Sequence, residues 1–545
     1  MKKNTPIYLL IVICLLRLLF LGNHDLVDPT ETRYAYIGLH MFSTGDWLTP
    51  MLPQAEGIIP YLGKPPLHFW LSALSYTIFG PSAWSARIPS FIDFLLILSA
   101  IYFFCIKFIS KESAISSMLV AVSAGLLFFL AGASVTDTTL TSTVTLAIYF
   151  LYEALENNTK KSFYIAAIFS ALAFLTKGPI GIVLIALPFF LFMCVKKDFT
   201  NIKKIPFIPC ILIFSVITLP WFILSEIKNP GFIKYFIWNE NIGRYLFKDY
   251  GDKYGSGHIH TRGSSWWMLL LGFLPWTLFV LRAVFHKGFL SAILADNRKL
   301  FIWCWAISTP LFFTFVRQLH AMYLLPAIPA FSIIASIYWL ETEKYWEENF
   351  KQFFSLKTIV LSSLAFIILI IVGSFFTWSL SAAFIATLVS ILSIWFISRD
   401  TSDDGELESI KALSKISAFF VTLYLLVVIS FGNYIDIKRS SNETLQNFIT
   451  KAQASEELPL QVGIFTFNTY SPYWLEETVN RSAIKNNEKE KIKIIPVKPD
   501  KLVSSNNIKF VLVKSKLFED IDPRITNIYG EYFKQGAWWV LKRKF

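Results

Sequence analysis

Long apolar runs recur along this chain of 545 residues and constrain its fold more than any other feature. Each run has about 18–22 residues, enough for a helix to cross a hydrocarbon core of roughly 30 Å. Hydrophobic residues make up 54% of the chain, a share that the polar surface of a soluble protein does not allow. The sequence therefore predicts a polytopic α-helical membrane protein with about thirteen transmembrane helices. We expect these helices near residues 7–22, 86–106, 114–132, 138–154, 162–176, 178–195, 206–226, 265–283, 299–316, 321–340, 358–376, 379–397 and 414–432.

Lysine and arginine gather in alternate loops between these runs, as at Lys160 and Lys161. The positive-inside rule assigns such loops, and the N-terminus, to the cytoplasm. An odd number of helices then places the C-terminus on the other face. The net charge of +12 is explained by these loops and by contact with anionic lipid. We therefore expect membrane lipids as partners and no nucleic acid.

The composition changes near residue 437, where Asn, Lys, Glu and Ser become frequent. Short strand-like runs follow at 461–467, 492–497, 508–513 and 537–541, with a helical stretch at 443–454. About 110 residues are enough for one small domain. We predict a transmembrane domain over residues 1–436 and a small soluble α/β domain over residues 437–545, on the outer side of the membrane.

The loop after the first apolar run brings Asp28, Glu31, Arg33 and Tyr34 close together in sequence, and Lys64 follows them. A charged side chain at a membrane edge costs free energy, so such a residue usually has a function. The alternative is an ordinary polar loop that only joins two helices. Within this loop we expect an amphipathic segment at 34–42. The apolar segment that ends near Gly80 is too short to cross, so we expect it in the interface or re-entering the membrane.

Further polar residues fall on the same predicted outer face. Asp137 lies at the mouth of a helix, where a carboxylate is either an N-terminal cap or a functional group. Lys177 runs against the positive-inside bias, which favours an anion-binding role. The pair His258 and His260 fits either a metal site or histidines at the membrane interface. The remaining candidates on this face are Arg262, Arg317 and Tyr323.

This distribution indicates an outer-face cavity for an anionic and partly lipidic substrate, with phosphates on the cations. The helix interiors carry few charges, which disfavours a lipid or polysaccharide transporter. The chain has no P-loop and no dinucleotide fingerprint, so a nucleotide is not expected. The five cysteines lack CxxC spacing, so we expect neither disulfides nor a metal cluster.

Several motifs together resemble the bacterial lipid A glycosyltransferases typified by 4-amino-4-deoxy-L-arabinose transferase. This family is related to the protein O-mannosyltransferases within the GT-C superfamily of membrane glycosyltransferases. The motifs are Glu31-Thr32-Arg33-Tyr34-Ala35, Gly45-Asp46-Trp47, Lys64-Pro65-Pro66-Leu67, Trp70, Thr136-Asp137, Thr176-Lys177-Gly178-Pro179, Gly272-Phe273-Leu274-Pro275-Trp276 and Tyr323-Leu324-Leu325-Pro326.

The resemblance implies transfer of a sugar from an undecaprenyl-phosphate carrier to a lipid A phosphate at the periplasmic face of the inner membrane. The sugar would be 4-amino-4-deoxy-L-arabinose or a related one. Glu31, Asp28 and Asp137 are then the expected catalytic residues. The expected substrate-binding residues are Arg33, Tyr34, Lys64, Lys177, His260, Arg262 and Tyr323. We expect a monomer that requires no cofactor, with a divalent metal left open.

Two positions depart from the family pattern. Thr30 stands where the family usually has its catalytic Asp, and Gly63 stands where it often has a metal-binding Glu. A lipid A phosphate is already an anion, so it needs no general base. We therefore hypothesise that Lys64, Arg33 and Arg262 matter more than any one carboxylate, because cations stabilise the departing phosphate.

Two other functional classes remain as alternatives, in addition to the transporter. A protein O-mannosyltransferase-like enzyme would act on a Ser or Thr hydroxyl and would need a carboxylate base. A structural membrane protein whose C-terminal domain binds a partner would leave the outer-face cations unexplained.

Overall fold

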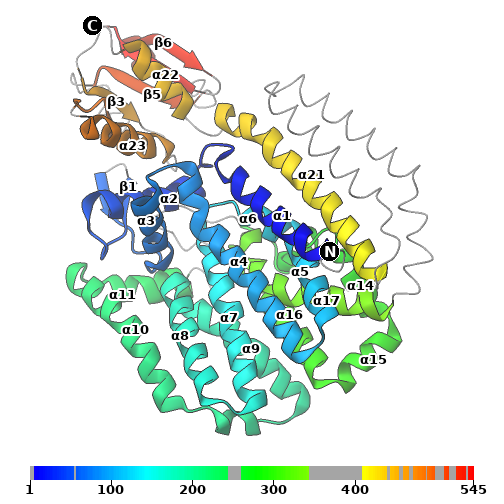
Figure 1. Cartoon of the computed structure of the whole chain (residues 1–545). Helices are drawn as coiled ribbons and strands as arrows, with labels where there is room; N and C mark the ends of the chain where they lie inside the picture. Colours follow the sequence, from blue (N-terminus) through cyan, green and yellow to red (C-terminus); the bar gives the residue numbers. More distant parts are fainter. Residues whose placement is uncertain are drawn as a thin grey trace, which may run out of the picture. The chain divides into compact units, whose positions relative to one another are not determined.

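Figure 1 shows the chain as a computed structural model. The structure describes residues 5–54, 57–243, 259–342, 408–438, 442–452, 458–464, 470–486, 488–496, 508–514, 523–535 and 538–544. The chain divides into two compact units. The helical unit comprises Met1–Phe20, Gly63–Leu67 and Ser90–Val428, and the mixed unit comprises Leu21–Leu62, His68–Pro89 and Ile429–Phe545.

The described part of the helical unit consists mainly of apolar helices. They are α1 (Thr5–Leu19), α4 (Ala83–Phe108, which starts in the mixed unit), α5 (Lys111–Val122), α6 (Gly125–Leu130), α7 (Thr136–Asn157), α8 (Lys160–Lys177), α9 (Pro179–Lys196), η2 (Thr200–Lys204), α10 (Phe207–Lys228), α11 (Phe232–Lys234), η3 (Tyr235–Gly243), α13 (Ser264–Gly272), α14 (Thr277–Phe285), α15 (Lys287–Ala295), α16 (Asn297–Phe313), η4 (Ala321–Ala327), α17 (Ile328–Glu341) and α21 (Glu408–Lys438, which ends in the mixed unit). Helix α8 packs against α7, its neighbour along the chain, and against α10, which comes two helices later (Figure 1).

Within the described residues, six helices are long and apolar enough to cross a membrane, or seven if the bent pair α14 and α15 forms one span. The predicted spans 358–376 and 379–397 lie outside the described residues, and the other predicted spans coincide with described helices. A polytopic helical architecture is therefore confirmed, while the count of about thirteen stays a prediction.

Two predicted spans are broken. Residues 114–132 form α5 and α6, and residues 265–283 form α13 and α14 with Pro275 in the second break. Proline has no N–H and cannot continue a helix. The two breaks satisfy each other's polar groups, because the Leu274 carbonyl accepts a hydrogen bond from Gly125 N at 3.0 Å. It also accepts one from Tyr424 Oη at 2.8 Å. Irregular backbone within a membrane protein requires such partners.

Arg17 is a charged residue inside the first helix, and it is almost fully buried. Its guanidinium donates to the Phe128 carbonyl at 3.1 Å and to the Phe129 carbonyl at 3.2 Å. These carbonyls belong to the last turn of α6, so Arg17 caps that helix. A Cβ at Gly132 would collide with the guanidinium, which explains the glycine there.

The mixed unit combines the first loop with the C-terminal segment. Its elements are η1 (Phe20–Gly22), α2 (Thr30–Thr44), β1 (Met51–Gln54), β2 (Gly57–Pro60), α3 (Leu67–Phe79), α22 (Asn442–Ala452), β3 (Leu460–Ile464), α23 (Ser471–Lys485), β4 (Ile492–Pro496), β5 (Phe510–Lys514), α26 (Pro523–Ile528), β6 (Tyr529–Gln535) and β7 (Trp538–Arg543). The amphipathic segment predicted at 34–42 lies in α2. The short apolar segment is α3, with 13 residues, which is too short to cross a membrane.

A five-stranded sheet with the order β4-β3-β5-β7-β6 forms the centre of the C-terminal segment. β3 pairs in parallel with β4 and β5, whereas β7 pairs antiparallel with β5 and β6. The four predicted strand-like runs correspond to β3, β4, β5 and β7, and the sequence reading did not include β6. Tyr36 of α2 and Trp474 of α23 are buried in cores shared by the first loop and this segment. The predicted domain boundary at 436/437 stays a prediction.

Candidate functional site

Glu31 lies in the first turn of α2 and forms a buried ion pair with Arg87. Arg87 Nε is 2.7 Å from Glu31 Oε1, and Arg87 Nη2 is 3.0 Å from Oε2. The other guanidinium donors bond the carbonyls of Leu21, His24 and Asp25. Burial opposes ionisation of Glu31, but the charge and hydrogen bonds of Arg87 outweigh it and lower the Glu31 pKa. This network ties the chain before α2 to the start of α4.

Asp28, two residues before α2, accepts hydrogen bonds from the beginning of α23. Its Oδ1 accepts from Tyr470 N at 2.9 Å and from Ser471 N at 3.2 Å, and its Oδ2 accepts from Ser471 Oγ at 2.6 Å. Thr32 Oγ1 also donates to Oδ1. Burial raises the Asp28 pKa, while the hydrogen bonds from Ser471, Thr32 and Tyr470 oppose that rise. Asp28 therefore acts as an N-terminal cap for a distant helix.

Arg33 and Tyr34 lie side by side on α2 beneath a group of aromatic rings. The Arg33 guanidinium carbon is 5.1 Å from the centre of the Tyr34 ring and 5.9 Å from that of Tyr61. Burial raises the pKa of the Tyr470 hydroxyl, and the Arg33 charge opposes this rise. The aromatic surroundings hold the guanidinium by cation–π attraction.

In the helical unit, Asp137 and Lys177 form a second buried ion pair. Asp137 is in the first turn of α7 and Lys177 is in the last turn of α8, and the Lys177 Nζ to Asp137 Oδ1 distance is 2.6 Å. Their side chains are only 2% and 7% exposed. Lys177 Nζ also lies 3.8 Å from the centre of the Tyr323 ring on η4. Three predicted site residues from three elements therefore meet at one point.

The other predicted residues of the helical unit are spread over nearby loops. The backbone around His260 lies beside that around Arg317, because His260 N donates to the Arg317 carbonyl at 2.8 Å. Gly263 N donates to the Thr314 carbonyl at the same distance, next to the exposed Arg262. Lys64 is half-buried, and His258 lies outside the described residues.

The described residues give little support for a metal centre. Gly63 has no side chain to offer where the family often has a Glu. In the ranges given above, no three His, Cys, Asp or Glu side chains gather as metal ligands. The expectation that no cofactor is required stays a prediction, and a divalent metal stays open.

Sequence reasoning missed two buried charged residues. Arg87 is the partner of Glu31, and an arginine at the start of a predicted span is a signal that could have found it. Asp93 lies within α4 and accepts hydrogen bonds from Thr139 Oγ1 at 2.6 Å and Ser142 Oγ at 2.5 Å. Asp93 thus fixes α4 against the first turns of α7, just beyond Asp137.

Comparisons with known proteins find similar sequences and similar structures. The model of the family described as dolichyl-phosphate-mannose-protein mannosyltransferase matches residues 63–224. The undecaprenyl phosphate-alpha-4-amino-4-deoxy-L-arabinose arabinosyl transferase of Shewanella sediminis is 28% identical over 340 residues, which cover 61% of this chain and 59% of the relative. A relative of the same name from Proteus mirabilis is 28% identical over 353 residues, covering 62% and 60%. The chain thus spans about three fifths of the length of these curated relatives.

The solved structures extend the likeness to nearly the whole chain. The crystal structure of ArnT from Cupriavidus metallidurans bound to undecaprenyl phosphate superposes with a TM-score of 0.74 at 18% identity, covering 99% of this chain and 98% of that one. An oligosaccharyltransferase from Archaeoglobus fulgidus superposes with a TM-score of 0.54 at 11% identity, covering 98% of this chain and 74% of that one. The chain therefore shares the fold of these two membrane enzymes.

The relatives found by sequence comparison share a more specific name. The relatives at 28% identity are named as arabinosyl transferases. The predicted resemblance is confirmed: the chain is similar in sequence to 4-amino-4-deoxy-L-arabinose transferases and shares the fold of one of them.

Proposed function

We propose that this protein transfers a sugar from an undecaprenyl-phosphate carrier to a phosphate of lipid A. The sugar is 4-amino-4-deoxy-L-arabinose or a related one, and the protein works as a monomer in the bacterial inner membrane. The observation that carries the proposal is the buried Asp137–Lys177 pair beside Tyr323, in a chain related to arabinosyl transferases. Buried ionisable residues in a membrane protein are functional by default.

The proposed chemistry uses charges of both signs. The bond between the anomeric carbon and the carrier phosphate breaks, and an oxygen of the acceptor phosphate bonds to that carbon. Positive charge builds on the sugar and is stabilised by the Asp137 carboxylate. Negative charge builds on the leaving phosphate and is stabilised by lysine or arginine. Tyr323 offers a ring for the sugar to pack against, next to the Lys177 ammonium.

The three candidate carboxylates have different surroundings. Glu31 is bonded at both oxygens by Arg87, and Asp28 is bonded at both by the start of α23. We assign these two the task of shaping the loop that carries Arg33 and Tyr34. Asp137 is held by one lysine through Oδ1, so it is our choice for the carboxylate that faces the sugar.

Lys64, Arg33 and Arg262 remain our candidates for contacts to phosphate, because each is a cation with a side chain that is not fully buried. We place Asp137 and Lys177 on the periplasmic side. The lysines at the opposite ends of α7 and α8, Lys160 and Lys161, support this orientation by the positive-inside rule. We place the C-terminal α/β segment on the periplasmic side as well.

The test uses the purified full-length protein in detergent with undecaprenyl-phosphate 4-amino-4-deoxy-L-arabinose and lipid A, and the products are analysed by mass spectrometry. We expect lipid A to gain one sugar. Asp137→Asn should lower the rate by about 100-fold or more, the scale seen when a transition-state charge loses its partner. Glu153→Gln, at an ion pair on the other end of α7, is the matched control and should keep the rate. An Asp137→Asn enzyme with full activity would overturn the role of Asp137.

A second candidate function is a protein O-mannosyltransferase-like reaction, which the matching family model over residues 63–224 favours. The acceptor would be a Ser or Thr hydroxyl, and Asp137 would serve as general base. Replacing lipid A with Ser-containing and Thr-containing peptides, and the donor with a polyprenyl-phosphate mannose, distinguishes the two. Glycosylated peptide with unmodified lipid A would select this second function.

A further inference from the structure

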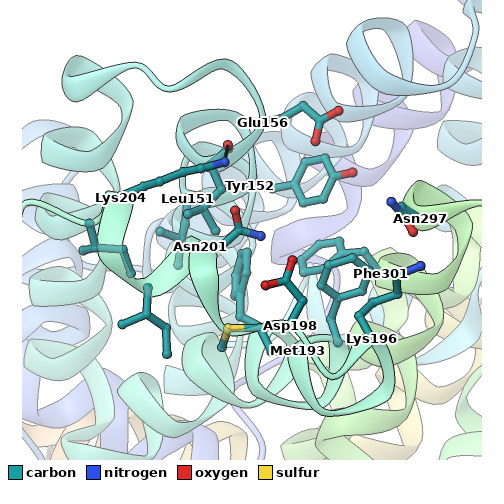
Figure 2. Close-up of a pocket in the computed structure, with 15 residues that line it drawn as sticks. Leu151, Tyr152, Glu156, Met193, Lys196, Asp198, Asn201, Lys204, Asn297 and Phe301 are labelled. Atoms are coloured by element: carbon teal, nitrogen blue, oxygen red, sulfur yellow. Dashed lines mark hydrogen bonds between the residues drawn. The ribbon is translucent and has the colours of Figure 1, made fainter.

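A hollow of about 280 Å³ lies at one end of the helical unit, among the last turns of α7 and α9, the start of α16, and η2. Figure 2 shows its lining. None of the predicted site residues contributes to this lining. The hollow is therefore separate from the Asp137–Lys177 pair.

The hollow lies about one membrane thickness from that pair along α7. Asp137 is in the first turn of α7, and Glu156, which lines the hollow, is in its last turn. Nineteen residues at about 1.5 Å each give roughly 28 Å. A hydrocarbon core is roughly 30 Å thick. The hollow therefore opens at the opposite membrane surface from Asp137.

The floor of the hollow is aromatic and already packed. The ring of Phe301 lies 4.5 Å from that of Tyr152 and 4.7 Å from that of Phe189, measured between ring centres. All three side chains are buried. Such a floor suits the glycerol backbone and first methylenes of a lipid.

The rim carries charges of both signs. Lys196 and Lys204 flank Asp198, whose pKa is lowered first by hydrogen bonds from Thr200 and then by these two lysines. Lys204 Nζ lies 3.4 Å from the Leu155 carbonyl. In Figure 2, Asp198 lies between Lys204 on one side and Lys196 on the other.

Glu156 adds a second carboxylate to this rim. It is 45% exposed and lies 3.9 Å from Arg298. The distance and the exposure make this a weak ion pair that a ligand can replace. The rim thus presents two ammonium groups and two carboxylates to one ligand.

The segment beside the hollow also carries exposed apolar side chains. Phe199 is 47% exposed and Ile202 is 37% exposed, and both lie among lysines. Exposed aromatic and aliphatic side chains mixed with lysine are typical of a segment that rests in the lipid interface. A membrane lipid is therefore the ligand that reaches this hollow most directly.

We propose that the hollow binds the headgroup of a phosphatidylethanolamine-type phospholipid. The lipid phosphate contacts the ammonium groups of Lys196 and Lys204. The primary ammonium of the ethanolamine donates hydrogen bonds to Glu156 and Asp198. A choline headgroup has no N–H to donate, and a glycerol headgroup has no cation, so neither matches the rim as well.

The test uses the full-length protein in detergent micelles and three short-chain lipids with ethanolamine, choline or glycerol headgroups. Binding is measured by native mass spectrometry and by isothermal titration calorimetry. We expect the ethanolamine lipid to bind about tenfold more tightly than the choline lipid, as one charged hydrogen bond allows. Equal affinity for the three, or tightest binding of the glycerol lipid, would overturn the proposal.

Substitutions in the rim test which residue contacts which part of the lipid headgroup. Lys196→Gln with Lys204→Gln should weaken binding of all three lipids by about tenfold, because the phosphate loses its cations. Glu156→Gln should reduce the preference for ethanolamine over choline, because Asp198 remains as an acceptor, and should leave binding of the choline lipid unchanged. Lys160→Gln with Lys161→Gln removes the same charge from the exposed first turn of α8 and should change nothing. Binding of soluble phosphoethanolamine as tight as that of the lipid would show a site for a soluble anion instead.

Discussion

The Glu31–Arg87 pair allows a quantitative prediction, because both partners are buried and their geometry is known. The side chain of Arg87 is 0% exposed and that of Glu31 is 6% exposed. Arg87→Met leaves the Glu31 carboxylate buried without its cation. Breaking a buried pair in this way typically costs about 3–5 kcal/mol. We therefore expect Arg87→Met to lower the free energy of unfolding by about that amount.

A double-mutant cycle separates the coupling energy between Glu31 and Arg87 from the contribution of the other hydrogen bonds that Arg87 makes. Glu31→Leu combined with Arg87→Met removes both charges, so no charge remains buried alone. The double variant should then cost less than the two single variants together, with a coupling of about 2–3 kcal/mol. The three carbonyls bonded by Arg87 lose their donors in both the single and the double variant, so their contribution cancels.

The assay is a denaturant titration of the full-length protein in detergent micelles, followed by tryptophan fluorescence. The exposed pair Lys107–Glu153 is the control, with side chains 39% and 15% exposed. Its disruption by Lys107→Met should cost no more than about 1 kcal/mol. Additive costs at Glu31 and Arg87 would refute the reasoning, because they would show that the two charges do not depend on each other.

Three further predictions concern other buried polar groups. Ser471→Ala removes one of the donors to Asp28 and should cost about 1–2 kcal/mol in the same titration, whereas no change would mean that the cap is not needed. Burial raises the pKa of Glu476 from its ordinary value of 4.5 to about 7, so ionisation of Glu476 destabilises the fold as the pH rises through this window. Glu476→Gln should therefore match the wild type in stability near pH 4 and exceed it near pH 8, and a constant difference would contradict the assignment. Lys177→Gln leaves Asp137 without its cation and should lower transfer activity by about 100-fold in membranes at matched expression, while retained activity would remove Lys177 from the site.

The sequence predicted those parts of the fold that a membrane dictates. Span positions followed from the length of apolar runs, because the hydrocarbon thickness fixes how long a crossing helix must be. Asp137 and Lys177 could be assigned to one face because Asp137 is at the start of α7 and Lys177 is at the end of α8, and a short turn joins the other ends of these two helices. The breaks near Ser123 and Pro275 were missed, because the apolar composition continues across them and hydropathy does not register a change of direction.

The partners of the first-loop carboxylates could not be read from the sequence. Arg87 is 56 residues from Glu31, and Ser471 is 443 residues from Asp28. No periodic pattern links residues at such separations, since only packing brings them together. The same loop motif is compatible with catalytic or with structural carboxylates until those partners are known.

The most direct test of the proposed function is mass spectrometry of lipid A from cells with and without this gene. We predict that lipid A from cells with the gene carries one additional sugar on a phosphate, that this mass is lost without the gene, and that the wild-type gene restores it while Asp137→Asn does not. Identical lipid A in the two strains would contradict the account and would direct attention to glycosylated proteins.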